Sequence, residues 1–271
     1  LACEQLGRRF VPGPFAATIT AAVVCGDDRA AAGERVVTYA ERGTSVTVIP
    51  HLRGSSVVWF VGDDRVDQLG ASEIEAVDVA EPYDPLTPVA WTTNAAGADR
   101  VAADAAAERV AADTAAVRVA ADAAAVRCAL HLLEAAQLLG LASGAGELSV
   151  KYAGEREQFG RPIGSFQAVK HLAADQLVRT ELARAAVYAA AVTWDSAAEG
   201  PPSSEVTRAV VGAKLLAAEA ALNNAKAAVQ IHGGMGYTWE VDAHLLLKRA
   251  YVLSESLGGR EALVEAVAAT L

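Results

Sequence analysis

The chain has 271 residues, of which 53% are hydrophobic and 21% are charged, so it can build a sizeable core and wholesale disorder is not expected. A formal net charge of −10 argues against a protein that binds nucleic acids or anionic membranes by electrostatic attraction. The length suggests roughly two domains.

Cysteine usage and the lack of export signals predict a soluble, cytoplasmic protein. Cys3, Cys25 and Cys128 are scattered and form no CxxC pair, which is typical of free thiols in a reducing compartment. The sequence shows no signal peptide and no uninterrupted apolar run of about 18 residues. Because Leu1 to Arg9 read as the interior of a helix, we expect that a further segment precedes Leu1.

The first third of the chain changes from helical to strand-like composition. Residues 1–31 favour helix, with a break at the Pro-Gly-Pro of residues 12–14. From Arg35 onwards, short β-branched runs separated by Gly, Ser or Asp predict strands. They are RVVTYAE, SVTVIP, SVVWFVG, EAVDVAE (75–81) and PVAWT (88–92). No strand is followed by a long helix, so a doubly wound sheet is not expected.

An alanine-rich stretch with a nine-residue period follows the predicted strands. Arginine recurs at positions 100, 109, 118 and 127 around units that resemble VAADAAA. Nine residues span about two and a half helical turns, so successive arginines fall on opposite faces of a helix. This spacing does not suit a binding stripe, and we interpret the stretch as a duplicated linker that becomes helical.

The rest of the chain predicts four long helices joined by short breaks. The first carries an apolar stripe at helical spacing, made of Val126, Leu130, Leu133, Leu141, Leu148 and Tyr152. The second begins near Phe166, and the third follows a loop in which Ser203 or Ser204 can cap. The fourth runs from about Asp242 to Ser256 and ends at Leu-Gly-Gly. Such a pattern favours an antiparallel bundle and a mainly α protein with a small β domain.

Pairs of opposite charge four residues apart are expected to stabilise two of these helices. Glu147 and Lys151 are spaced to pair on the first helix, and Asp175 and Arg179 on the second.

Two breaks between these helices hold chemistry-bearing residues: REQFGRPIGSFQ (156–167) and QIHGGMGYTWE (230–240). Glycine turns and helix N-termini expose backbone N–H groups that attract phosphate oxygens. Arg156 could add a bidentate charged contact to a phosphate. Gln167 and Gln230 could form hydrogen bonds with a nucleotide, and Phe159 could pack beside a flat ring. Neither break is a GxGxxG or a P-loop, so on spacing alone helix caps and a Pro-Gly turn are the favoured interpretation.

The segments YAGEREQFGRPIGSFQAVKHLAAD from Tyr152 and QIHGGMGYTWEVDAHLLLKRA from Gln230 resemble the two signature stretches of acyl-CoA dehydrogenases. The resemblance covers about residues 126–259, and EQLGRRFVPGPF near the start is more faintly similar. It implies a remnant of an N-terminal helical domain (1–34), a reduced β domain (35–99) and a C-terminal four-helix bundle (100–271). The family removes two hydrogens from the α and β carbons of an acyl-CoA thioester.

In that family a carboxylate takes the α proton, and FAD takes the β hydride and passes electrons to an electron-transfer flavoprotein. The neighbouring subunit's bundle holds the adenine and pyrophosphate end of the FAD. The residues that the resemblance assigns to this half-site are Arg156, Gln158, Phe159, Gln167, Gln230, Ile231, His232, Gly233 and Gly234.

The positions of the family's catalytic Glu carry no carboxylate in this chain. One position corresponds to Leu257, and the position used by a minority of the family corresponds to Leu130. Glu255 and Glu134 lie nearby, but we expect both to be ordinary exposed helix residues. The family's flavin-side motifs are also poorly matched, because YAERGTS (39–45) departs from the first and WTTN (91–94) comes after the strands.

The resemblance therefore implies a degenerate, non-catalytic subunit of a bacterial α2β2 acyl-CoA dehydrogenase of the steroid-degrading type, acting on a bulky CoA thioester. A homologous partner would supply the catalytic Glu. Two alternatives stay open: a homomeric dehydrogenase that uses Glu255 or Glu134, and a scaffold subunit without FAD.

No metal site is predicted. The histidines show no ligand spacing such as HxxxH, and a structural or surface role is favoured for His51, His131, His171, His232 and His244. The resemblance places His131 where the family often has an arginine near the substrate, but we expect no catalytic role for it. His232 lies inside a signature loop and could form a hydrogen bond near the cofactor.

Overall fold

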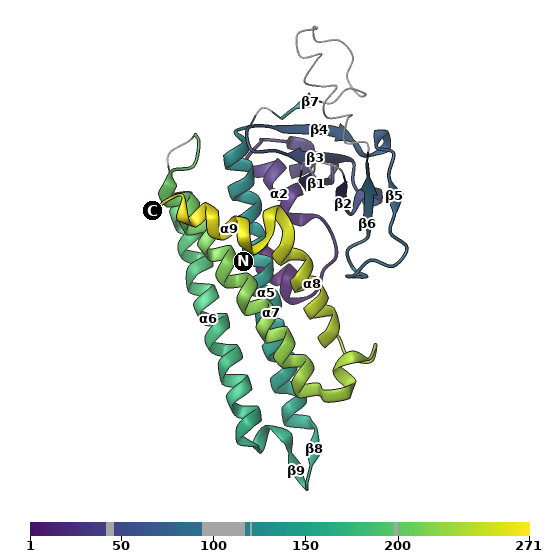
Figure 1. Ribbon diagram of the computed structural model, residues 1–271, viewed down its shortest axis with the longest axis vertical. Coiled ribbons are helices and arrows are strands. Elements are labelled where there is room, and N and C mark those ends of the chain that lie inside the picture. The colour runs from purple at the N-terminus through teal and green to yellow at the C-terminus, as the bar shows by residue number, and fades with distance from the viewer. Residues whose placement is uncertain (42–45, 94–116, 120, 198–199) are drawn as a thin grey trace. The chain divides into compact units, whose positions relative to one another are not determined.

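The computed structural model describes residues 1–41, 46–93, 117–119, 121–197 and 200–271 (Figure 1). Its internal contacts divide the chain into two compact units. We call residues 1–11, 131–198 and 202–271 the helical unit, and residues 12–130 with 199–201 the β unit. Asn94 of WTTN, residues 42–45 of YAERGTS, and Arg100 and Arg109 of the arginine repeat lie outside the described residues.

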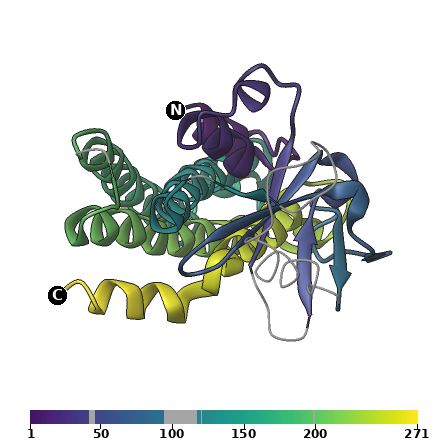
Figure 2. The same cartoon turned by 90° about the horizontal axis from the view of Figure 1, so that it is seen from above.

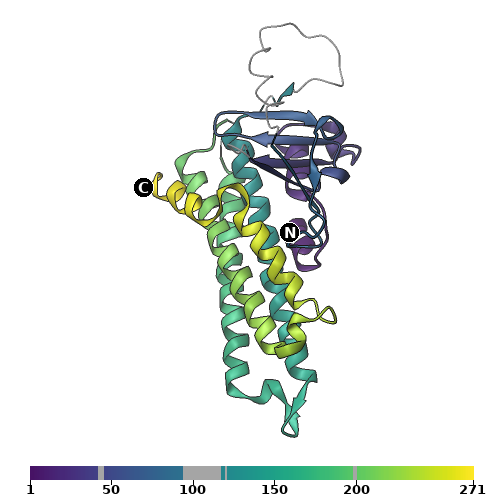
Figure 3. The ribbon, with the colours of Figure 1, turned by 45° about the vertical axis from the view of Figure 1, so that its right-hand side comes forward.

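Four long helices in alternating directions make up the helical unit, as Figures 1 and 3 show. They are α5 (Ala123–Glu155, whose first residues belong to the β unit), α6 (Gln167–Asp195), α7 (Ser204–His232) and α8 (Ala243–Glu255). Shorter helices are α1 (Ala2–Arg8) and α9 (Gly259–Ala268). The prediction of an antiparallel bundle in a mainly α protein with a small β region is confirmed.

The core of the bundle is built largely from alanine and leucine. Helix α7 lies between α6 and α8 and buries a long row of alanines, among them Ala213, Ala217, Ala221 and Ala228. Leucines of α5 and α8 belong to the same buried cluster: Leu138, Leu139, Leu141 and Leu246. Small side chains let the helix axes approach closely, and Figure 2 shows the long helices nearly end-on.

Helix α1 is fixed to the bundle by glycine and by charge. A Cβ on Gly140 of α5 would lie 2.0 Å from the carbonyl oxygen of Glu4, so only glycine fits this backbone contact. The buried carboxylate of Glu4 accepts hydrogen bonds from Arg184 and, at 2.7 Å, from the Tyr188 hydroxyl. On the same side, Glu147 lies 2.5 Å from Arg8, so the expectation that it pairs with Lys151 is not met. The Asp175–Arg179 pair is confirmed at 3.9 Å.

Helix boundaries follow the local sequence signals. The Ser203 hydroxyl accepts from the Val206 N–H and caps α7, as predicted, and α6 begins directly after Phe166. Helix α7 ends at His232, and the next residue, Gly233, has a φ of 60° that only glycine adopts without strain. Helix α8 ends at Glu255, before the Leu-Gly-Gly turn, as predicted. A further helix, α9, then begins at Gly259.

Within its described residues, the β unit contains two sheets of short strands. One has the order β1 (Val37–Glu41), β3 (Val57–Val61), β4 (Val66–Gly70) and β7 (Val117–Arg118), with β1 and β3 parallel. The other has the order β2 (Thr47–Pro50), β6 (Val89–Thr92) and β5 (Val77–Asp78). Ile49, Val58 and Phe60 lie in their shared core. Helices α2 (Phe15–Val23) and α3 (Asp28–Ala31) precede the strands.

Strand β4 was not predicted because polar residues interrupt its hydrophobic pattern. Buried Asp67 accepts from Arg65 at 3.1 Å, and Gln68 accepts from the Trp59 indole of the neighbouring strand at 3.1 Å. One local partner, Arg65, and one cross-strand partner, Trp59, thus satisfy polar groups that look unsuited to a strand in the sequence. The fourth predicted strand is also shorter than expected, since β5 has only two residues.

Helix α5 is, within the described part of the chain, the one helix long and apolar enough to cross a membrane by composition alone. Because 72% of its apolar window is buried, the core of a soluble bundle explains the same composition. At its start, Arg127, the last arginine of the repeat, donates to the Gly62 carbonyl at 3.1 Å, so this arginine anchors the helix within the β unit.

Candidate functional site

Both signature breaks lie at the same end of the helical unit. The first forms strands β8 (Glu157–Gln158) and β9 (Arg161–Pro162), labelled in Figure 1, and the short helix η3 (Ile163–Ser165). The second forms η4 (Gly233–Tyr237). The Tyr152 ring stacks on His232 with centroids 4.2 Å apart, and its hydroxyl lies 3.7 Å from the Met235 sulfur. We call residues 156–167 and 230–237 together the cradle.

A tight hairpin displays an aromatic side chain in the first half of the cradle. Strands β8 and β9 pair antiparallel around Phe159 and Gly160, which both have positive φ, at 54° and 75°. This is the backbone of a two-residue hairpin turn, and a bulky residue adopts it only under strain. Phe159 is 92% exposed, and its ring meets the Phe166 ring edge-on at 6.1 Å.

The second half of the cradle exposes two glycines. Added Cβ atoms on Gly233 and Gly234 would meet no heavy atom within 4 Å, so the space beside both α-carbons is open, and the Gly233 N–H donates to the Gln230 carbonyl. Gly236 is different, because a Cβ there would lie 2.7 Å from the Val229 carbonyl oxygen. Gly236 therefore serves packing, whereas Gly233 and Gly234 leave room for a bound group.

The predicted cofactor residues divide into an exposed and a buried set. Those exposed at the cradle are Arg156, Gln158, Phe159, Gln167, Gln230, Gly233 and Gly234. Ile231 and His232 are buried, and a His232 ring nitrogen lies 2.7 Å from the Ala228 carbonyl oxygen. The exposed set offers one guanidinium, three amides and open backbone, which suits the phosphates and polar edges of a nucleotide.

The structure adds cradle residues that sequence reasoning missed. The guanidinium of Arg161 lies 4.3 Å above the Phe166 ring, so the cradle contains a second cation in addition to Arg156, held by a cation–π contact. Tyr237 and Trp239 are also largely exposed just beyond Gly236. The Phe-Gly at the centre of EQFGRP, flanked by polar residues, is the signal that could have revealed the hairpin.

The position predicted for a catalytic carboxylate lies at the other end of α8. Leu257 is buried with φ 55° and ψ 48°, a left-handed conformation inside η5 (Ser256–Gly258). Leu130 is fully buried on α5. Neither side chain can accept a proton. Glu255 is exposed on the last turn of α8, as expected.

Glu134 is not the exposed residue that the sequence predicts. It is 1% exposed, and its Oε2 atom accepts from Lys214 Nζ and from the Ser256 hydroxyl, both at 2.7 Å. Lys214 is fully buried on α7 and also donates to the Ser256 carbonyl at 2.8 Å. The expectation fails because the partner lies 80 residues away in the sequence.

His131 completes this cluster. The histidine is buried, and its Nδ1 atom lies 3.3 Å from Lys214 Nζ. We call Glu134, Lys214, Ser256 and His131 the buried ion-pair cluster. Glu134 could reach a substrate proton only if this cluster opened, because its Oε2 atom is engaged by two donors inside the bundle.

Comparison with protein families gives a match to "Acyl-CoA dehydrogenase, C-terminal domain" over residues 131–271. The acyl-CoA dehydrogenase FadE34 of Mycobacterium tuberculosis is 33% identical over 281 residues, which cover 94% of this chain and 35% of FadE34. The acyl-CoA dehydrogenase IpdE2 of Mycolicibacterium smegmatis is 46% identical over 127 residues, or 47% of this chain and 37% of IpdE2. The chain thus spans about a third of the length of these curated relatives.

Solved structures share the fold over almost the whole chain. The ChsE4-ChsE5 complex from Mycobacterium tuberculosis superposes with a TM-score of 0.77 at 20% identity, covering 98% of this chain and 78% of that one. A variant of the Tcur3481-Tcur3483 steroid ACAD gives 0.75 at 23% identity, covering 99% and 78%. At these identities the likeness concerns the fold.

Proposed function

Because the chain belongs to the acyl-CoA dehydrogenase family, we propose that it is the non-catalytic half of an FAD-dependent acyl-CoA dehydrogenase. It holds the adenine and pyrophosphate end of an FAD whose flavin lies in a homologous partner, and that partner supplies the catalytic Glu. One contrast carries the proposal: the cradle presents cation, amides and open backbone, while the carboxylate position holds Leu257.

The residues of the cradle fit the anionic half of a dinucleotide. Arg156 would contact the pyrophosphate, since an exposed guanidinium forms strong charge-assisted hydrogen bonds with phosphate oxygens. Gln167 and Gln230 would form hydrogen bonds with polar edges of the nucleotide, and Gly233 and Gly234 leave room for the nucleotide to approach the backbone. Phe159 supplies an exposed aromatic face. When bound, FAD supplies the hydride acceptor for the acyl chain.

Neither position at which the family carries its catalytic Glu holds a proton-accepting side chain in this chain. Leu257 and Leu130 are apolar, and the carboxylate of Glu134 is engaged by Lys214. Glu255 is exposed at the end of α8, whereas Leu257, two residues further along and in a left-handed conformation, is buried. These features argue against the homomeric alternative, in which Glu255 or Glu134 would be the base.

The substrate that we propose is a bulky, steroid-derived acyl-CoA, and an electron-transfer flavoprotein would accept the electrons. The fold likeness to a steroid ACAD supports the substrate class, and the likeness to the ChsE4-ChsE5 complex supports a partner of a different sequence. The exposed donors of the cradle argue against a scaffold subunit without FAD, because a subunit that binds no cofactor does not require hydrogen-bond donors at this position.

Co-expression tests this proposal directly. The chain is produced alone and with each homologous acyl-CoA dehydrogenase subunit encoded beside it, and flavin absorbance and subunit ratio are measured after purification. We expect little FAD with the chain alone and about one FAD per pair of unlike subunits, as one composite site per pair requires. Full flavin loading and turnover of the isolated chain would support the homomeric alternative, and a flavin-free complex would support the scaffold.

A further inference from the structure

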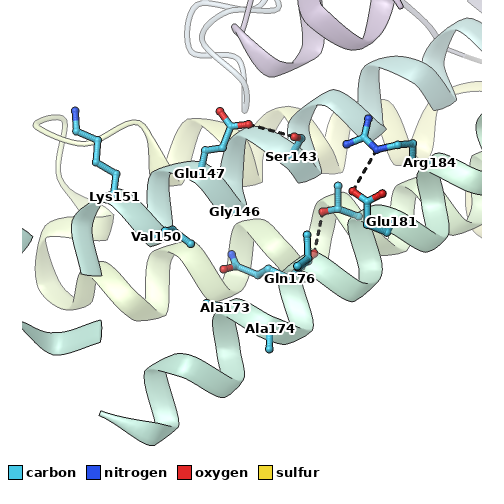
Figure 4. Close-up of a pocket in the computed structure, with 12 residues that line it drawn as sticks. Ser143, Gly146, Glu147, Val150, Lys151, Ala173, Ala174, Gln176, Glu181 and Arg184 are labelled. Carbon is cyan, nitrogen blue, oxygen red and sulfur yellow. Dashed lines mark hydrogen bonds and ion pairs between the residues drawn. The ribbon is translucent and has the colours of Figure 1, made fainter. Parts of the chain in front are cut away.

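A groove runs between helices α5 and α6 of the helical unit (Figure 4). It has a volume of about 640 Å³ and is lined mainly by apolar atoms. Small-molecule sites commonly have volumes of about 300–1,000 Å³. The lining residues lie at positions 143–151 of α5 and 173–184 of α6, so the groove shares no residue with the cradle.

The groove is open because small residues face it from both helices. Gly146 of α5 and Ala173 and Ala174 of α6 line it, and a Cβ on Gly146 would meet no heavy atom within 4 Å. Val150 and Leu177 form its apolar walls and are 58% and 62% exposed. An apolar molecule in the groove would remove this surface from water, which is favourable.

One buried polar side chain, Gln176, lies on the floor of the groove. It is 1% exposed, and Figure 4 shows it reaching from α6 toward α5. Its Nε2 atom donates to the Ser149 hydroxyl oxygen at 3.0 Å and to the Asn224 carbonyl oxygen at 2.9 Å. Because the Ser149 hydroxyl donates its own proton to the Ala145 carbonyl at 2.8 Å, it can only accept from Gln176. These contacts fix which end of the amide carries the oxygen.

The Oε1 atom of Gln176 is an unpaired acceptor. It is buried, and no donor among the described residues lies within hydrogen-bond distance of it. The Thr180 hydroxyl is not such a donor, because it donates to the Gln176 main-chain carbonyl at 2.8 Å. Leaving a buried acceptor unpaired is unfavourable, so an O–H group that reached Oε1 would be stabilised. A group that only accepts, such as a carboxylate or an ether oxygen, would gain nothing there.

The charges around the groove are paired or in contact with water. Glu147 pairs with Arg8 at 2.5 Å, and Glu181 pairs with Arg184 at 3.2 Å. Lys151 at the rim is exposed, so its ammonium group is hydrated. An ion in the groove would lose its hydration without gaining a buried partner, whereas a neutral molecule has no such loss. The groove therefore favours a neutral ligand.

We propose that this groove binds a neutral amphiphile, which is an apolar chain that carries one hydroxyl group. The hydroxyl donates to Gln176 Oε1, and the apolar chain lies between Val150 and Leu177. Binding requires neither flavin nor a partner chain, so this inference goes beyond the proposed function and does not rest on it.

Two ligands with the same apolar chain test the hydrogen bond. Isothermal titration calorimetry of the full chain with octanol is expected to show saturable binding of one molecule per chain. Octyl methyl ether has the same alkyl chain but no donor, so it leaves Oε1 unpaired and is expected to bind about tenfold more weakly, or worse. This comparison uses the unchanged protein.

Filling the groove tests its location. Gly146→Leu places a side chain in the open space beside Gly146 and is expected to lower the affinity for octanol about tenfold or more. Leucine favours helix more than glycine does, so urea unfolding should show a fold at least as stable. Gly212→Leu is the matched control, because Gly212 is a glycine of α7 with the same open space but outside the groove, and this variant should bind octanol normally.

Gln176→Met tests the acceptor itself. Methionine keeps the length of the side chain and removes the amide oxygen, so octanol and octyl methyl ether are expected to bind this variant equally. Because Gln176 also donates to Ser149 and Asn224, the comparison of the two ligands in the unchanged chain decides the point if this variant does not fold.

Three results would overturn the proposal. They are no saturable binding of octanol up to its solubility limit, equal binding of octanol and octyl methyl ether by the unchanged chain, and octanol binding that survives Gly146→Leu. A preference for octanol that persists in folded Gln176→Met would overturn the assignment of Gln176 as the acceptor.

Discussion

The cradle and the α8–α9 turn lie at opposite ends of one helix, α8, and they have opposite chemistry. At the cradle, Arg156, Gln167 and Gln230 are exposed, and the backbone of Gly233 and Gly234 is open. At the turn, Leu257 is buried, and the nearest inward-facing carboxylate, Glu134, is bound by Lys214. The same bundle thus holds a surface suited to a ligand at one end and a sealed core at the other.

This difference shows that the donors for a nucleotide and the position for a catalytic base lie at different places in one fold. Binding a nucleotide end requires exposed donors, whereas removing a proton requires a base within hydrogen-bond reach of the substrate. In this chain the first requirement is met at the cradle, and neither family position for the base meets the second. The proposed heteromeric assembly is the arrangement in which both are met by different chains.

The largest expected effect comes from exchanging glutamates in the assembled complex. Replacing the partner's catalytic Glu by Gln should lower turnover by about 10²–10⁴, the usual effect of removing a general base. Glu255→Gln in this chain should change turnover less than about threefold, because the Glu255 side chain is exposed, whereas the family position at Leu257 is buried. Stopped-flow bleaching of the flavin by an acyl-CoA measures both. A loss above about a hundredfold with Glu255→Gln would place an active site in this chain.

Breaking the buried ion-pair cluster should destabilise the fold without touching the cradle. Lys214→Met removes the cation that neutralises the buried Glu134 carboxylate, which costs about 3–5 kcal/mol of unfolding free energy. The double variant Lys214→Met with Glu134→Leu should recover much of this loss, since an apolar pair replaces the ion pair. Urea unfolding of the chain measures both. A loss below about 1 kcal/mol for Lys214→Met would mean that the pair is not sealed from water.

Removing the guanidinium of Arg156 tests the cradle itself. A charge-assisted hydrogen bond contributes about 1.5–3 kcal/mol, so Arg156→Ala should lower flavin retention in the complex about tenfold or more. Arg260→Ala is the control, because Arg260 is an exposed arginine of α9 outside the cradle. Flavin content after gel filtration measures the effect. Equal flavin in the Arg156→Ala and Arg260→Ala complexes would remove Arg156 from the site.

The smallest effect concerns Asp27 in the β unit, a paired but half-buried acid that contrasts with Glu134. Burial alone would raise the pKa of Asp27, but hydrogen bonds from the Ala30 and Arg29 N–H groups and the Arg35 guanidinium bring the pKa below its usual value of 3.8. A lowered pKa in the folded state means that the carboxylate adds stability above about pH 3.8 and loses it as the pH falls further.

Asp27→Asn tests that contribution. The side chain caps α3, and Asn keeps the cap but loses the ion pair with Arg35, 2.8 Å away. We expect a loss of about 0.2–1 kcal/mol at pH 7, the range of partly exposed ion pairs. The difference between the two proteins should shrink as the pH falls below about 3.8. Thermal unfolding at several pH values measures it, and a difference independent of pH would exclude the ion pair as its cause.

Contiguous patterns in the sequence were sufficient for the bundle and for the location of the cradle. The apolar stripe through Leu130 and Leu141 predicts α5, Ser203 marks the start of α7, and the glycines after His232 mark its end. These signals are local, because helix periodicity and capping depend on residues a few positions apart. The resemblance to acyl-CoA dehydrogenases rests on two stretches of this kind, and the family match agrees with it.

Burial and pairing were decided by the tertiary structure alone. Glu134 looks like an exposed acid until α7 brings Lys214 to it, and Glu147 is set to pair with Lys151 until α1 brings Arg8 to it. Val178, Leu182 and Val187 are all apolar residues of one helix in the sequence, but only the packed bundle leaves the first two 57% and 61% exposed and buries the third. The physical reason is that burial and ion pairs depend on groups far apart in the chain, which a local pattern does not contain.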